Sequence, residues 1–242
     1  MTVRQDVHSA GIPVLCRACE ARHGGICGAL EPAQLVALAK TSSKRQVEPG
    51  SELIGDAEAI ETYANVLAGV VKLTKSLADG RQQIVGLQFA PDFLGRPFSA
   101  ESIVNAEAAT GVSLCSFPRN TIERMIAESP GLERRLHEQT LKELDEARDW
   151  MLTLGRKTAS EKIASFLLMI ARHADPTADE PAQSAVFDLP LTRAEIADFL
   201  GLTIETVSRQ LTKLRTDGVI RIENNRHIVV QSIARLEARS GS

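Results

Sequence analysis

Apolar and polar positions alternate through the middle of the chain, between residues 46 and 117. The alternation is clearest from Val71 to Leu77 and from Val85 to Phe89, and a period of two is typical of strands with one buried face. The Asp79-Gly80 pair between these runs favours a tight hairpin. Other glycine and proline pairs divide the region into short segments. This region therefore predicts a small antiparallel barrel or roll.

Two helices are predicted on either side of the roll, because apolar residues recur there at helical spacing. The first runs from Glu31 to Ala39, and Pro32 suits its first turn. The second opens at Ser129 and Pro130 and continues to about Leu154. Its apolar stripe advances in steps of four and three, as in a coiled-coil seam: Leu132, Leu136, Thr140, Leu144, Ala147, Met151 and Leu154. A core helix can carry the same stripe, but the densely charged outer face favours a dimer interface.

The last third of the chain has the signals of a helix-turn-helix. Thr192 and Glu195 form a capping box, Gly201 ends the helix that follows, and Thr203 caps the next one. A small residue, a glycine and a β-branched residue stand at the offsets that this motif needs: Ala197, Gly201 and Val207. These signals predict two short helices joined by a tight turn.

The second of these helices is amphipathic in a way that suits DNA. One side is apolar and is expected to face the core: Ile204, Val207, Leu211 and Leu214. The opposite arc carries Glu205, Ser208, Arg209 and Thr212. Arginine donates twice to guanine and glutamate accepts from the cytosine amino group, so this arc can contact base edges in a major groove. The alternative is an ordinary solvated face. The helix caps at Thr192 and Thr203, together with Gly201 and Val207 at the offsets of the motif, disfavour it.

A hairpin is predicted after the second helix of the helix-turn-helix. It runs from Gly218 to Val230, with its turn at Asn224-Asn225. It makes the last domain a winged helix, and Arg221 and Arg226 on the wing are expected to meet phosphates. The chain has 242 residues and a formal net charge of -3, so any affinity for DNA must come from such a local patch. We find no signal peptide and no run that could span a bilayer, and expect a soluble cytoplasmic protein without membrane contact.

The four cysteines form a distinctive pattern. Cys16, Cys19 and Cys27 are spaced C-x2-C-x7-C, and the fourth, Cys115, lies far along the chain. Three crowded thiols in a reducing compartment suggest a metal site. Zinc usually comes with a second C-x2-C pair, which is missing here, whereas a four-iron, four-sulfur cluster tolerates one distant thiolate. Free surface thiols are the alternative, and His23 is a less favoured ligand.

The order of these parts resembles the Crp/Fnr superfamily of bacterial transcription regulators, in particular the Fnr-type oxygen sensors of the FnrL group. The resemblance covers nearly the whole chain and rests on the cysteine pattern and on three stretches: DGRQQIVGLQFAPDFLGRP, LGRKTASEKIASFL and ETVSRQL. It implies an α+β fold with an N-terminal cysteine segment (1–30), a cyclic-nucleotide-binding-like β-roll (31–130), a dimerisation helix (131–155) and a winged helix-turn-helix domain (156–242). The Fnr branch often has a C-x2-C-x5-C spacing, and the loop here is longer.

The same resemblance implies the chemistry of the sites. Cys16, Cys19, Cys27 and Cys115 would hold an oxygen-labile [4Fe-4S] cluster. Glu205, Ser208 and Arg209 would contact a TTGAT-like half-site in double-stranded DNA. The Arg-Ser pair that binds cyclic phosphate in other members is absent from GRPFSAESIVNAEA, so no cyclic nucleotide is expected. RNA polymerase is an expected partner.

The leading hypothesis is a homodimeric, oxygen-responsive transcription regulator. A first alternative keeps the DNA binding but replaces the sensor by a zinc site, a thiol switch or a response to nitric oxide. A second alternative is an iron–sulfur electron carrier, which would leave the helix-turn-helix without a purpose. We find no nucleophile–base constellation, phosphate loop or carboxylate pair, and therefore expect no enzymatic activity.

Overall fold

The computed structural model describes residues 11–13, 16–17, 19–174 and 183–241. The first ten residues of the expected cysteine segment lie outside this set. The chain separates into two compact units, Met1–Lys75 with Val85–Glu143, and Ser76–Ile84 with Leu144–Ser242. The long helix α4 (Pro130–Arg156) contributes its first half to one unit and its second half to the other.

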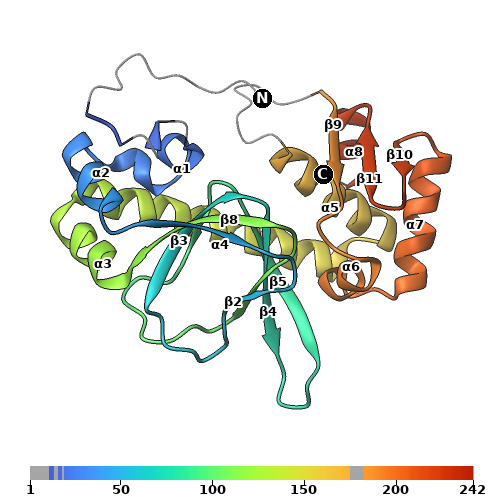
Figure 1. The fold of residues 1–242 in the computed structure, drawn as a ribbon. Coiled ribbons are helices and arrows are strands. Elements are labelled where there is room, and N and C mark those ends of the chain that lie inside the picture. The colour runs from blue at the N-terminus through green and yellow to red at the C-terminus, as the bar shows by residue number, and fades with distance from the viewer. Residues whose placement is uncertain (1–10, 14–15, 18, 175–182, 242) are drawn as a thin grey trace. The chain divides into compact units, whose positions relative to one another are not determined.

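Two four-stranded sheets form the predicted roll, in the orders β1-β8-β3-β6 and β2-β7-β4-β5 (Figure 1). Their strands are β1 (Ser43–Val47), β2 (Glu52–Ile54), β3 (Thr62–Ala68), β4 (Val70–Ser76), β5 (Gln82–Phe89), β6 (Phe93–Leu94), β7 (Asn105–Ala108) and β8 (Val112–Pro118). Pairing of β8 with both β1 and β3 is antiparallel. The predicted hairpin between β4 and β5 is confirmed, since Leu77 N–H donates to Arg81 O at 2.8 Å and Gly80 has a φ of +86°. The roll is therefore present as expected.

Short helices and the first half of α4 complete the first unit: α1 (Glu20–His23), the 3₁₀ helix η2 (Ile26–Ala29), α2 (Pro32–Ala39) and α3 (Arg119–Glu128). Residues from η2, α2, α3, α4 and the roll share one apolar core, which includes Ile26, Leu35, Phe117, Ile122 and Leu132. This core places the segment that carries the first three cysteines against β3 and against the start of α4.

The second unit contains the helix-turn-helix. Helix α5 (Ala159–His173) precedes α6 (Arg193–Leu200) and α7 (Ile204–Thr216), and α8 (Ile233–Arg239) ends the chain. A three-stranded antiparallel sheet forms the wing, with β9 (Ala185–Asp188), β10 (Ile220–Glu223) and β11 (His227–Val230) in the order β10-β11-β9. Strand β9 was not expected from the sequence.

Local signals in the second unit are confirmed. The side chains of Thr192 and Glu195 form the predicted capping box, and Thr203 accepts a hydrogen bond from the N–H of Thr206. Gly201 is left-handed, with a φ of 61°. Asn224 and Asn225 also have positive φ and form the turn of the wing. Among the described helices, none is both long enough and apolar enough to cross a membrane.

Candidate metal centre and nucleic-acid interface

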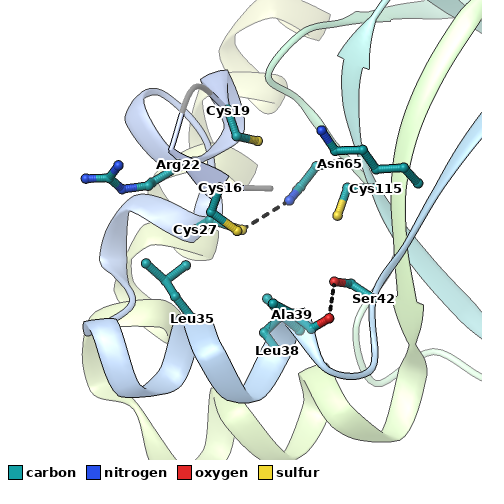
Figure 2. Close-up of a pocket in the computed structure, with 11 residues that line it drawn as sticks. Cys16, Cys19, Arg22, Cys27, Leu35, Leu38, Ala39, Ser42, Asn65 and Cys115 are labelled. Atoms are coloured by element: carbon teal, nitrogen blue, oxygen red, sulfur yellow. Dashed lines mark hydrogen bonds between the residues drawn. The ribbon is translucent and has the colours of Figure 1, made fainter. Parts of the chain in front are cut away.

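Four thiols from separate segments line one cavity in the first unit (Figure 2). Cys16 and Cys19 precede α1, Cys27 lies in η2, and Cys115 lies in β8. Register explains the place of Cys115, because it pairs with Lys44 of β1 on one side and with Asn65 of β3 on the other. Cross-strand partners share a face of the sheet. The structure therefore brings all four predicted cysteines together, including the one most distant in sequence.

The close approach of the cysteine segment to the roll requires glycine. A Cβ on Gly25 would lie 2.8 Å from Pro91 O and 2.9 Å from Ala21 O. A Cβ on Gly28 would lie 2.8 Å from Arg22 O. All three distances are too short for any side chain, so these glycines allow η2 to pack where Cys27 faces the cavity.

The cavity is mainly apolar, with a few polar groups around the sulfurs. Leu35, Leu38 and Ala39 of α2 line it together with the thiols. Asn65 is fully buried, and its Nδ2 donates to Cys27 Sγ at 3.3 Å. Its Oδ1 is buried without a hydrogen-bond partner among the described residues. Orphaned buried polar atoms are uncommon and costly, and they often mark a functional site.

Burial raises the pKa of three of the four thiols, so these three are weaker acids than an ordinary cysteine. Burial, assisted by Cys19 and Cys115, raises the pKa of Cys27 to about 12, although the hydrogen bond from Asn65 opposes this shift. Burial also raises the pKa of Cys16 and of Cys115. These three thiols are therefore protonated at neutral pH in the metal-free chain. A metal bound here must displace their protons, so its binding is coupled to proton release.

The four donors in the cavity are thiols, which both zinc and iron–sulfur clusters accept as ligands. Thiolates on one tetrahedral zinc lie about 3.8 Å apart, given a bond of about 2.3 Å. Among the described residues, no group of three or more His, Cys, Asp or Glu side chains has the arrangement of a preformed metal-ion site. The four thiols line one cavity, and four thiolates are also the ligand set of a four-iron, four-sulfur cluster. His23 does not line this cavity, so the structure leaves it out of the candidate ligand set.

The apolar stripe of α4 serves more than one surface. Leu132 is fully buried in the core of its own subunit, with Ile26, Cys27 and Leu30. The prediction that it belongs to a dimer seam is therefore wrong, because it has no surface left for a partner. Leu136 is partly buried against the same core. The stripe from the helix start to about Leu136 thus faces inward.

From its middle onward, α4 exposes the stripe. The remaining predicted seam residues are all exposed in the single chain: Thr140, Leu144, Ala147, Met151 and Leu154. Met151 is 73% exposed and Leu144 is 44% exposed. Two further leucines, Leu141 (47%) and Leu152 (58%), are exposed on the same helix and were missed, because they fall outside the regular four-three spacing. Exposed large apolar side chains along one helix are typical of an interaction surface.

Helix α7 presents the predicted polar arc to solvent. Glu205, Ser208, Arg209 and Thr212 are all exposed, whereas Val207, Leu211 and Leu214 are buried. Ile204 is an exception to the predicted core face, since it is 48% exposed in the first turn of the helix. Hydrogen bonds from its own backbone N–H and from Thr203 hold the pKa of Glu205 below its ordinary value. Glu205 is therefore an ionised acceptor at neutral pH.

The wing adds cationic groups, one of which sequence reasoning missed. Arg221 and Arg226 are exposed, and Arg226 Nη2 donates to Leu189 O at 3.1 Å. Arg193, at the first position of α6, donates from Nη2 to Asn225 O at 3.0 Å. Its Nη1 is buried without a hydrogen-bond partner among the described residues, and burial lowers its pKa. Arg193, Asn225 and Arg226 line one cavity beside the wing. In the sequence, the signal that could have identified Arg193 was a basic residue directly after the Thr192 cap.

Comparison with known proteins agrees with both units. Residues 44–129 match the cyclic nucleotide-binding domain and residues 161–239 match the Crp-like helix-turn-helix domain. A probable transcriptional activator of Rhizobium leguminosarum bv. viciae is 59% identical over 97% of this chain and 96% of its own length. The transcriptional activator protein FnrL of Cereibacter sphaeroides is 43% identical over 93% of this chain and 92% of its own. The structure of FixK2 from Bradyrhizobium japonicum has a TM-score of 0.74 and 33% identity, and the match covers 83% of this chain and 98% of that one. The chain therefore belongs to the Crp/Fnr family of transcription regulators.

Proposed function

We propose that this protein is a homodimeric, oxygen-responsive transcription regulator whose sensor is a [4Fe-4S] cluster held by Cys16, Cys19, Cys27 and Cys115. The observation that carries the proposal is the convergence of four thiols, from three separate parts of the chain, on one apolar-lined cavity. When bound, such a cluster supplies an oxygen-labile group that links four thiolates. The family supports transcriptional regulation, and the oxygen response rests on this donor set.

The residues around the cavity have separable tasks. Asn65 donates an N–H to Cys27 Sγ, which stabilises negative charge on that sulfur. Leu35 and Leu38 limit access of water from the α2 side. Ile26, next to Cys27, shares a core with Leu132 of α4. A change in the position of the cysteine segment would therefore alter the packing at the start of α4. The later turns of the same helix expose the apolar seam.

A weak seam suits a regulated dimer. Thr140 and Ala147 interrupt the leucines of α4, and Asp145, Glu146 and Asp149 place negative charge beside them. A small change in free energy can shift the population of a marginal dimer strongly. In the dimer, two α7 helices would stand about 34 Å apart, in successive major grooves of a palindrome with TTGAT-like half-sites.

The exposed groups of the second unit divide the contacts to DNA. Glu205, Ser208 and Arg209 of α7 contact base edges, and Thr212 adds a polar contact one turn later. Arg193, Arg221 and Arg226 contact phosphates. Among the described residues, the buried Nη1 of Arg193 has no hydrogen-bond acceptor, and a phosphate oxygen would supply one. A surface for RNA polymerase completes an activator of this kind.

The test begins with protein purified without oxygen. Iron, acid-labile sulfide and zinc are assayed, the visible spectrum and molecular mass are recorded, and binding to the palindromic duplex is measured before and after air exposure. We expect iron and sulfide in equal amounts, a brown dimer that binds, and loss of colour, pairing and binding in air.

Variants assign the ligands in the same assay. Cys115→Ser should abolish iron and sulfide binding, whereas Ser113→Ala on the same strand should retain both. Zinc in place of iron would support the alternative of a structural metal site. A colourless preparation that binds the duplex equally in both states would reject the oxygen-sensing proposal and leave a winged-helix regulator.

A further inference from the structure

Arg135 connects the cysteine segment to helix α4 by direct hydrogen bonds. Its Nη2 donates to Gly24 O at 2.5 Å, and its Nε donates to Gly25 O at 3.4 Å. The two partners are 110 and 111 residues away in sequence. Gly24 and Gly25 lie between Cys19 and Cys27, so a single side chain of α4 holds the loop that carries two of the four thiols.

The accepting carbonyls are well placed for a cation. They follow directly after α1 (Glu20–His23), and Gly25 O also accepts from Gly28 N–H at 3.3 Å. Gly25 is buried, and the contacts that exclude a Cβ there fix its backbone in place. Cationic side chains commonly donate to carbonyls near the C-terminal end of a helix. A guanidinium can serve two of them at once through its planar fork, which a lysine ammonium cannot do with the same geometry.

Arg135 also has a second acceptor on its own helix. Its Nη1 lies 3.6 Å from Glu138 Oε2, one turn further along α4. The Arg135 side chain is 40% exposed and the Glu138 side chain is 57% exposed. Exposed pairs of this kind contribute little, so the loop carbonyls dominate while the loop is in place. When the loop leaves, Glu138 remains as an acceptor for the freed guanidinium.

Arg135 lies on α4 between the turns that pack against the cysteine segment and the turns that are exposed. Leu132, one turn before it, is buried against the cysteine segment, and Leu136, next to it, is partly buried there. Thr140, where the exposed seam begins, is five residues further on, or about 7.5 Å along the axis. Arg135 therefore stands at the change from the part of α4 that faces its own core to the part that faces outward.

We infer that Arg135 is the positioning residue through which the cysteine loop and the dimer-forming helix hold one another in place. This inference rests on the proposed function for its regulatory meaning, but the contact itself is a property of the metal-free chain. Ordering of the loop fixes Arg135 and the adjoining turns of α4, and α4 in turn limits the freedom of Cys19 and Cys27.

The experiment compares Arg135→Ala and Arg135→Lys with Arg134→Ala, a matched control that removes the same charge from the exposed neighbouring position. Hydrogen exchange of the amides in residues 19–27 is measured in the metal-free protein. We expect exchange in Arg135→Ala to be roughly tenfold faster, as loss of a charge-assisted hydrogen bond predicts. Arg135→Lys should fall between that variant and the wild type, and Arg134→Ala should match the wild type.

A second measurement tests the coupling. Iron-loaded protein is kept without oxygen, and the dimer dissociation constant is measured by sedimentation at equal iron content. We expect Arg135→Ala to weaken pairing by roughly tenfold and Arg134→Ala to leave it unchanged.

The outcomes separate the two ideas. Equal loop exchange in Arg135→Ala and Arg134→Ala would overturn the anchoring contact, and wild-type exchange in Arg135→Lys would overturn the need for a two-donor fork. Faster exchange with unchanged pairing would overturn the coupling. If the wild type binds no iron or sulfide, the proposed sensor fails, while hydrogen exchange still decides the contact.

Discussion

Replacing Leu132 by alanine should destabilise the single subunit rather than the dimer. Leu132 is fully buried among apolar residues of its own chain. The substitution removes three carbon atoms, which at about 0.8 kcal/mol per group is a transfer loss of roughly 2.4 kcal/mol. A residual cavity adds to this loss, and measured values for buried leucines are about 2–5 kcal/mol. We expect Leu132→Ala to lower the free energy of unfolding of the subunit by about 3 kcal/mol.

Leu144→Ala is the matched comparison on the same helix. Leu144 is 44% exposed in the single chain, so its truncation should cost the subunit less than about 1 kcal/mol. Its loss should instead weaken pairing, because the exposed part of the side chain is what a partner would cover. The two substitutions remove the same atoms and differ only in what surrounds them.

Thermal unfolding of metal-free protein, followed by circular dichroism at concentrations low enough for monomers, separates these effects. A loss of about 3 kcal/mol lowers the Tm of a unit of this size by roughly 10 °C, and we expect that shift for Leu132→Ala alone. Sedimentation of the loaded protein should show the reverse order, with Leu144→Ala weaker in pairing. Unchanged melting of Leu132→Ala together with lost pairing would refute the assignment of Leu132 to the subunit core.

Three other predictions concern the sites. Arg209→Ala should lose about 1–3 kcal/mol of discrimination at one base pair, whereas Arg193→Ala should weaken all duplexes alike and reduce the slope of log K against log salt by about one; anisotropy titrations on operator variants would contradict both assignments if the two patterns were exchanged. Asn65→Leu should raise the Tm of the metal-free protein, because it removes a buried Oδ1 without a partner, yet shorten the lifetime of the cluster absorbance in air, because Cys27 loses a donor; a longer lifetime would show that the amide does not support the sulfur. Burial raises the pKa of Glu123, but hydrogen bonds from Phe98, Tyr63 and Arg119 outweigh it and leave the pKa below its ordinary value. Its stabilising contribution is therefore present above pH 4.5, the value of an unperturbed glutamate, and is lost as the pH falls through the folded pKa. The Tm advantage of the wild type over Glu123→Gln should accordingly be seen at pH 7 and should disappear in acid, and a constant difference across that range would contradict the linkage.

Local features of the sequence determined much of the helix-turn-helix and one hairpin of the roll. The capping box of Thr192, the left-handed Gly201 and the turn at Asn224-Asn225 are all present as predicted. Each depends on interactions within about four residues, which a linear sequence displays directly. The hairpin at Gly80 is equally local. The alternating runs did form strands, but Leu77 and Val85, which the alternation placed on the buried face, are exposed.

Only the tertiary structure decided which surface each apolar or polar group would face. An apolar stripe on a helix is the same whether it meets its own core or a second subunit, and this ambiguity explains the error at Leu132. The place of Cys115 beside Asn65 follows from strand register, and the contact of Arg135 with Gly24 joins segments more than a hundred residues apart. Such contacts depend on how distant elements pack, because burial and hydrogen bonding across them are set by three-dimensional neighbours rather than by neighbours in sequence.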